Sequence, residues 1–167
     1  TVISSGVTSL NGRPHSEFNA LKNLKSCSGA TLYTTLEPCT HYGRTPPCVD
    51  VILKKKIKKV YYAFEDPDLR TFKKAKKFLK SKGVQTKLIR SKKYSKFYKS
   101  YFHNKKFSLP YIAAKIALSK DFFSINEKNK WITNQTSRKI VHLFRNKYDC
   151  ILSTSKSINK DNSLLNC

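Results

Sequence analysis

Four residues in the first third of the chain have the types and spacing of a metal-dependent hydrolytic site: His15, Glu17, Cys39 and Cys48. A catalytic zinc ion takes three protein ligands and leaves a fourth position open to water. One imidazole and two thiolates meet that requirement, and they leave the metal acidic enough to ionise water near neutral pH. We therefore predict that His15, Cys39 and Cys48 bind zinc.

Glu17 lies two residues after the predicted ligand His15, in a stretch that reads as the start of a helix. That spacing places its carboxylate beside the open metal position without forcing it onto the metal. Glu17 can then take a proton from water and deliver it to a ring nitrogen and a departing amine. A structural zinc is the alternative, but it would require a fourth protein ligand, and His41 is the one candidate.

A histidine with a glutamate two positions later, followed by Pro-Cys and a further cysteine, is the signature of zinc-dependent nucleobase deaminases. Two residues separate the cysteines in nucleoside and tRNA deaminases, whereas the eight residues 40–47 separate Cys39 from Cys48 here. Residues 31–48 and 12–21 closely resemble the bifunctional riboflavin-biosynthesis deaminase–reductase family. The resemblance continues through essentially the whole chain.

The resemblance implies a substrate, 2,5-diamino-6-ribosylamino-4(3H)-pyrimidinone 5′-phosphate. Water activated by zinc would attack the ring carbon that carries the exocyclic amine, which leaves as ammonia. The segment between the cysteines would then hold the ribose phosphate through His41 and Arg44, since a guanidinium and a ring N–H suit a phosphate group. The alternative for Arg44 is a charged loop residue that does not contact the substrate.

The second half resembles the beginning of the family's dihydrofolate-reductase-like domain, which uses NADPH. Residues 110–121 match its first strand and turn, although Lys120, Asp121 and Phe122 stand where the family has Leu-Asp-Gly. By position, Arg145 would contact the substrate. For Trp131, one of the predicted NADPH contacts, a buried position in a hydrophobic core is the alternative. The positions that would contact NADPH are Leu118, Trp131, Ser157 and Asp161.

Alternating helix and strand patterns around these residues predict an α/β architecture. The resemblance specifies it further as a three-layer α/β/α domain of the cytidine deaminase type, followed by the start of the reductase domain. We expect the deaminase domain over residues 1–106 and the reductase segment over 107–167. The predicted strands cover residues 1–7, 30–36, 60–64, 84–89 and 111–118. The predicted helices cover residues 14–24, a stretch from about 46, 70–82 (ended by Gly83) and 92–107.

The chain carries 34 Lys and Arg against 10 Asp and Glu, a net charge of +24. Such a charge attracts nucleic acid, and aromatic and basic residues interleave over 92–107 in a pattern that could stack on bases. The alternative function is therefore a tRNA or DNA base deaminase, and a third reading is a non-catalytic zinc or nucleic-acid module. The long segment between the cysteines favours the small-molecule enzyme, and at helical spacing the aromatic residues are expected to face a core.

Five cysteines without a signal peptide or a membrane-spanning stretch indicate a reducing compartment. We therefore expect a cytoplasmic protein with no membrane partner. The resemblance implies that it can form a homo-oligomer. The chain lacks methionine and opens inside a strand-like pattern, so we expect the natural protein to extend beyond both ends.

Overall fold

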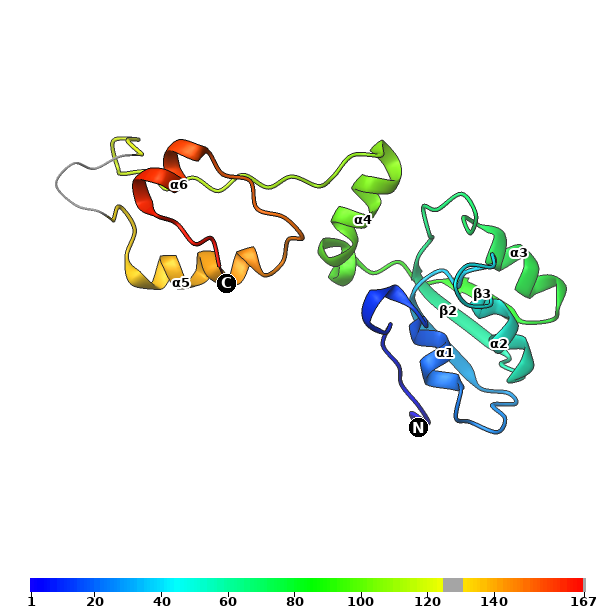
Figure 1. Ribbon diagram of the computed structural model, residues 1–167. Coiled ribbons are helices and arrows are strands. Elements are labelled where there is room, and N and C mark those ends of the chain that lie inside the picture. Colours follow the sequence, from blue (N-terminus) through cyan, green and yellow to red (C-terminus); the bar gives the residue numbers. More distant parts are fainter. Residues whose placement is uncertain (125–130, 167) are drawn as a thin grey trace. The chain divides into compact units, whose positions relative to one another are not determined.

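The computed structural model describes residues 1–124 and 131–166, apart from the side chain of Asp161. The chain divides into two compact units, Thr1–Ile112 and Ala113–Cys167 (Figure 1). The first unit contains all of the strands among the described residues and all of the residues predicted to bind zinc.

A parallel sheet of three strands in the order β1-β2-β3 forms the centre of the first unit (Figure 1). Leu32 pairs with Val60, and Val60 pairs with Thr86. Parallel neighbours require a crossover, which is usually a helix, and the two helices α2 and α3 supply the two crossovers. The α/β class predicted for this part of the chain is therefore confirmed. The elements are β1 (Thr31–Leu36), α2 (Cys48–Lys54), β2 (Lys59–Phe64), α3 (Lys74–Ser81) and β3 (Gln85–Leu88).

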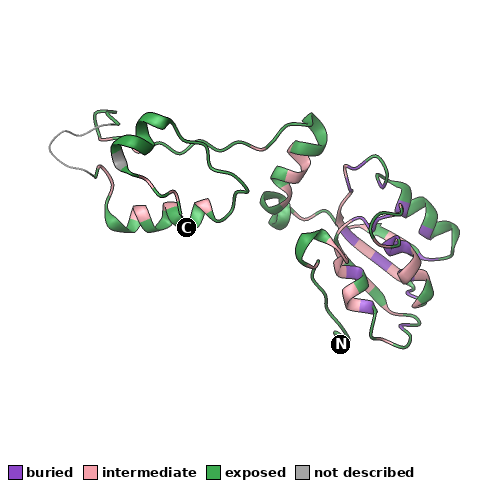
Figure 2. Ribbon diagram, in the orientation of Figure 1, coloured by how far each residue is buried: buried purple, intermediate pink, exposed green. Residues whose placement is uncertain are grey.

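The hydrophobic core lies on one face of this sheet. Val60 of β2 is fully buried against Ile52 of α2 and Leu79 of α3, and Leu21 of α1 (Ser16–Leu21) joins the same cluster. Residues of the opposite face alternate with these along the strands, and they are exposed in β1 and β3 but intermediate in β2 (Figure 2). Tyr33 of β1 is 69% exposed. Among the described residues, helices α1 to α3 thus form one layer on the sheet. On the opposite face, the Thr35 hydroxyl of β1 lies 2.6 Å from the Tyr98 hydroxyl, and the second helical layer of the predicted three-layer arrangement stays a prediction.

The helix expected over residues 70–82 begins later, at Lys74. The reason lies in two carboxylates just after β2, which satisfy nearby backbone donors and keep the chain in turns. Asp66 Oδ1 accepts the N–H of Asp68, and Asp68 Oδ1 accepts the N–H of Arg70, both at 3.0 Å. The helix ends as predicted, because Gly83 has a φ of +77°.

The strand predicted for residues 1–7 is wrong, since residues 1–9 form no regular element before the short 3₁₀ helix η1 (Leu10–Gly12). Instead of pairing with a strand, the segment bonds to α1. Ser4 Oγ donates to the Ala20 carbonyl at 2.6 Å, and Asn19 Nδ2 donates to the Val7 carbonyl at 2.8 Å. Gly6 allows this approach, because a Cβ there would lie 2.5 Å from the Ser16 carbonyl oxygen.

The basic aromatic segment forms a 3₁₀ turn, η2 (Lys92–Tyr94), and then the helix α4 (Ser95–Phe107). Its aromatic residues face the sheet only in part. Tyr98 and Phe102 contact Phe64 at the end of β2, with ring centroids 5.5 and 5.7 Å apart. Phe97 is 78% exposed. No residue of α4 is buried, so Tyr98 and Phe102 pack only partly against the sheet, and the prediction of a core-facing stripe is wrong for Phe97.

The second unit contains two helices among its described residues, α5 (Gln135–Arg145) and α6 (Ser155–Asp161). Each begins with a side-chain cap, from Asn134 and Thr154 respectively. The strand predicted for residues 111–118 is wrong, because no described strand pairs with it. No described residue of this unit is buried. No helix in the part of the chain that the structure describes is long and apolar enough to cross a membrane.

Candidate metal centre

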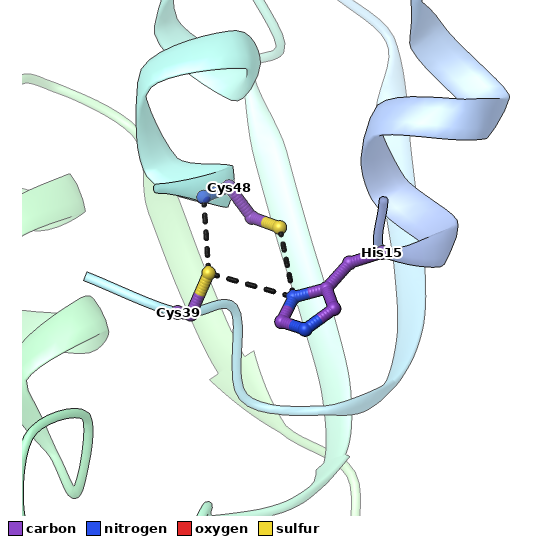
Figure 3. Close-up of side chains that lie close together, drawn as sticks. All are labelled: His15, Cys39 and Cys48. Atoms are coloured by element: carbon purple, nitrogen blue, oxygen red, sulfur yellow. Dashed lines mark hydrogen bonds between the residues drawn. The ribbon is translucent and has the colours of Figure 1, made fainter. Parts of the chain in front are cut away.

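The three predicted zinc ligands lie together in the first unit (Figure 3). Nδ1 of His15 is 3.5 Å from Sγ of Cys39 and 3.4 Å from Sγ of Cys48. All three donor atoms lie within 4.8 Å of one another, the single such group of His, Cys, Asp or Glu found in residues 1–124 and 131–166. Three segments far apart in the sequence therefore converge on one point.

Local structure explains how each ligand reaches that point. His15 is the N-cap position of α1, Cys39 follows the carboxyl end of β1, and Cys48 is the first residue of α2. The N–H of Cys48 donates to Sγ of Cys39 at 3.2 Å, and the N–H of Val49 donates to the Cys39 carbonyl at 3.3 Å. Pro47 stands at the N-cap position of α2, and the helix begins at Cys48, close to the start predicted near residue 46.

The donor set fits zinc in both chemistry and spacing. Tetrahedral zinc with ordinary bond lengths places its nitrogen and sulfur ligands about 3.6 Å apart, close to the two distances from His15 Nδ1. Both sulfur atoms belong to buried residues, each 3% exposed, so water has limited access to the thiolates. Three protein ligands leave a fourth zinc position open, as in catalytic sites.

The two thiols shift each other's pKa in opposite directions. The pKa of Cys39 falls to about 3, chiefly because the Cys48 thiol donates a hydrogen bond to its sulfur. The pKa of Cys48 rises for the same reason, because losing that proton would place a second negative charge in a buried position. Zinc binding requires both thiolates and therefore releases a proton.

Glu17 lies directly beside this centre. Glu17 is 7% exposed, and its Oε2 accepts a hydrogen bond of 3.0 Å from Ser16 Oγ. Burial raises the pKa of Glu17 above its ordinary value, and its carboxyl group interacts with the Cys48 thiol. A carboxyl whose pKa is raised by burial next to a metal centre is suited to accepting and returning a proton near neutral pH.

Glu37, directly before Pro38 and Cys39, is a buried residue to which the sequence alone assigned no role. It is 2% exposed, and its carboxylate accepts the N–H groups of Asp66, Lys73 and Ala75 at 3.4, 3.0 and 3.1 Å. These bonds tie the end of β1, two residues before Cys39, to the beginning of α3. A glutamate directly before Pro-Cys was the available signal, but its partners lie 29 to 38 residues away.

The residues predicted to bind the phosphate lie in the segment between the cysteines. His41 is partly buried, and its Nδ1 lies 3.1 Å from Oγ1 of Thr71. Arg44 is exposed. Both belong to the loop that joins two metal ligands, although their contact with a substrate remains a prediction.

The residues predicted to serve the reductase all lie in the second unit, and their roles also remain predictions. Trp131 is 57% exposed, with the Arg138 guanidinium 4.5 Å from its ring centroid, so the buried-core alternative for it is wrong. Leu118 is 43% exposed, and Arg145 Nη1 donates to the Asn166 carbonyl at 3.0 Å. Ser157 donates its N–H to Thr154 Oγ1 at 3.2 Å, and the side chain of Asp161 lies outside what the structure describes.

Comparison with known proteins identifies the class of this centre. Residues 2–64 match the family model described as the cytidine and deoxycytidylate deaminase zinc-binding region. That span contains the three ligands, Glu17 and the whole segment between the cysteines. The first unit is therefore similar to the zinc-binding region of these deaminases.

The chain is, further, similar to the riboflavin biosynthesis protein RibD of several bacteria. It is 34% identical to the protein of Bacillus amyloliquefaciens over 99% of this chain and 46% of that protein. It is 38% identical to the protein of Buchnera aphidicola over 98% of this chain and 45% of that protein. The chain spans about half the length of the curated relatives it matches.

Solved structures of RibD proteins are also similar to this chain. The chain superimposes on a RibD structure from Acinetobacter baumannii with a TM-score of 0.89 and 30% identity, covering 99% of this chain and 47% of that one. A Thermotoga maritima structure, described as a diaminohydroxyphosphoribosylaminopyrimidine deaminase/5-amino-6-(5-phosphoribosylamino)uracil reductase, gives a TM-score of 0.82 and 29% identity. It is matched over 97% of this chain and 48% of its own length.

Proposed function

We propose that the first unit catalyses the hydrolytic deamination of 2,5-diamino-6-ribosylamino-4(3H)-pyrimidinone 5′-phosphate in riboflavin biosynthesis. Water replaces the exocyclic amine on the ring carbon, and ammonia is released. The observation that carries the proposal is the convergence of His15, Cys39 and Cys48 beside the buried Glu17. The similarity of nearly the whole chain to RibD proteins supports the choice of substrate.

Zinc bound by the three ligands would polarise a water molecule so that it attacks at neutral pH. Glu17 accepts the proton that this water loses, since its raised pKa favours the protonated form after transfer. It delivers this proton to the ring nitrogen, then takes the remaining proton of the hydroxyl group added to the ring carbon and delivers it to the amine, which leaves as ammonia. Ser16 Oγ holds Oε2 of Glu17 through the 3.0 Å hydrogen bond, so the carboxylate keeps its orientation through the cycle.

The segment between the cysteines would bind the ribose phosphate. Arg44 supplies a planar cation that can form two parallel hydrogen bonds with phosphate oxygens. His41 supplies a second N–H donor, and Thr71 Oγ1, 3.1 Å from Nδ1, fixes its ring. Because this loop joins two metal ligands, the phosphate would anchor the pyrimidine ring over the metal.

Residues 107–167, which include the second unit, would form the beginning of a dihydrofolate-reductase-like domain. In the complete protein this domain would reduce the ribosyl group to ribityl with NADPH. Leu118, Trp131 and Ser157 would contact the cofactor together with Asp161, and Arg145 would contact the substrate. We place the complete protein in the cytoplasm and expect that it forms homo-oligomers.

A nucleic-acid deaminase is the second candidate function, and the net charge of +24 favours it. It predicts tight, salt-sensitive binding of RNA or DNA and deamination of a base within that strand. The similarity to RibD proteins along nearly the whole chain favours the small-molecule reaction instead.

The substitution Glu17→Gln tests the proposal, because it keeps the size of the side chain and removes the proton acceptor. We expect ammonia release from the diaminopyrimidinone phosphate to fall by about 10²–10⁴-fold, while the zinc content stays at that of the parent. The measurement pairs an ammonia assay with metal analysis of the same samples.

Glu65→Gln, a partly exposed position on the loop after β2, serves as the matched control and should leave both readouts unchanged. Full turnover by the Glu17→Gln protein would contradict the proposed role. Turnover of a single-stranded nucleic acid in place of the free nucleotide would favour the second candidate.

A further inference from the structure

Arg13, two residues before the ligand His15, reaches into the loop that joins the two cysteines. Its Nη1 donates to Oγ1 of Thr45 at 3.0 Å. Its guanidinium also lies against Gly43, where a Cβ would come 3.2 Å from Nη2. One partly buried side chain thus contacts both ends of the turn in which the Gly43 N–H donates to the Thr45 carbonyl.

The same guanidinium faces a metal ligand. Nη1 of Arg13 lies 3.9 Å from Sγ of Cys39, the sulfur that also accepts the N–H of Cys48. A cation at this distance from a thiolate stabilises its negative charge, and it does so strongly where water is largely excluded. Groups that hydrogen-bond to metal ligands typically change metal affinity by about 10–100-fold when they are removed.

From these contacts we infer that Arg13 is a positioning residue with two separable effects. It stabilises the thiolate of Cys39 as a metal ligand, and it holds the loop of residues 40–47 in place through Thr45. The segment that carries His15 and the loop that carries Arg44 are thereby coupled by one side chain. The inference rests on the proposed zinc site, but neither effect depends on which substrate is deaminated.

Two substitutions separate the effects in the full 167-residue chain. Arg13→Gln removes the cation and the loop contact together, whereas Thr45→Val removes the loop contact and leaves the cation beside Cys39. Arg13→Lys retains a positive charge without the forked geometry. Arg90→Gln removes an exposed arginine and serves as the matched control for the loss of charge.

Two measurements without substrate read out the result: the rate of zinc transfer to an excess of chelator, and hydrogen exchange of residues 40–47. We expect zinc transfer about tenfold or more faster in Arg13→Gln, intermediate in Arg13→Lys, and unchanged in Thr45→Val and Arg90→Gln. Exchange of the loop should accelerate in Arg13→Gln and in Thr45→Val but not in Arg90→Gln.

Zinc transfer from Arg13→Gln at the parent rate would overturn the effect on Cys39. Exchange of residues 40–47 in Thr45→Val at the parent rate would overturn the effect on the loop. If Arg13→Gln fails to fold, Arg13→Lys and Thr45→Val decide the two points in its place. A folded parent that binds no zinc would contradict the proposed function instead, and loop exchange would still decide whether Arg13 positions the loop.

Discussion

At the scale of single residues, the metal ligands could be predicted because their chemistry is visible in their types. A histidine and two cysteines offer the donors that zinc prefers, and the structure brings His15, Cys39 and Cys48 together. Arg13 and Glu37 could not be found in this way, because their roles depend on contacts with Thr45, Asp66 and other residues far away in the sequence. Only the fold makes those contacts known.

Replacing one ligand should empty the metal centre. Cys48→Ser removes a thiolate at the start of α2, and two remaining protein ligands bind zinc too weakly to retain it through purification. We expect one equivalent of zinc per parent chain and close to none in the variant, as determined by elemental analysis.

The matched control for this experiment is Cys150→Ser, which alters an exposed free cysteine outside the centre. It should keep the zinc content of the parent. Retention of zinc by a folded Cys48→Ser protein would contradict the assignment of Cys48 as a ligand.

At the scale of elements, the central pattern of strands and helices could be predicted to within a few residues. Between residues 30 and 89 each predicted element is present, because alternating and helical periodicities there reflect burial on one sheet face. The two wrong strands, residues 1–7 and 111–118, have the right composition but no strand beside them. A strand forms only with a partner, which its own sequence does not specify.

Glu37 links two of these elements, and its loss should weaken both the fold and the metal site. Glu37→Ala would leave the N–H donors of Asp66, Lys73 and Ala75 without their acceptor, and the bonds from Asp66 and Ala75 are buried. We expect the free energy of unfolding to fall by about 2–4 kcal/mol, measured by urea denaturation with zinc present.

Glu65→Ala provides the comparison, since this partly exposed carboxylate lies on the loop after β2, directly before Asp66. It should change the free energy of unfolding by less than about 0.5 kcal/mol. Equal effects of the two substitutions would show that Glu37 does not hold the two elements together.

A second link joins α4 to the turn after β2 and depends on pH. Asp68 Oδ2 pairs with Arg70 Nη2 at 2.7 Å and with Lys105 Nζ of α4 at 2.8 Å. The hydrogen bond from Arg70, followed by that from Lys105, holds the pKa of Asp68 well below its usual range. A carboxyl group with a lowered folded pKa stabilises the protein above its unfolded pKa of about 3.9. That contribution is lost as the pH falls below this value.

Asp68→Asn removes this dependence. Between about pH 5 and pH 3, the melting temperature of the parent should fall by about 2–5 °C more than that of the variant. Thermal unfolding at low salt measures the difference, because Arg70 is largely exposed and its attraction is screened by salt. Asp149→Asn, an exposed carboxylate, should behave like the parent. The same fall in the parent and in Asp68→Asn would contradict the link.

At the scale of the whole molecule, the dominant feature is the excess of positive charge. The chain carries 34 basic and 10 acidic residues, and both ion pairs found in the described part of the chain use the same aspartate, Asp68. Most lysines therefore repel one another without a nearby acid. A net charge far from zero keeps a protein soluble and destabilises its compact state through self-repulsion.

Salt should consequently stabilise this protein. Raising sodium chloride from about 20 to about 200 mM shortens the Debye length from roughly 20 to 7 Å, so the lysines repel one another less. We expect the melting temperature to rise by several degrees. Sucrose at equal osmolarity is the control for effects unrelated to charge, and a melting temperature that falls with salt would contradict the argument.

The order of the metal ligands along the chain has a consequence for biosynthesis. The three ligands are separated by 24 and 9 residues, and the elements that carry them are complete once α2 has formed. A bound ion would therefore act as a cross-link that closes two short loops, at a small cost in chain entropy. Because a nascent chain folds from its N-terminal side, zinc could be captured during translation, before α3 and α4 are made. Zinc supply during synthesis would then set the yield of folded protein.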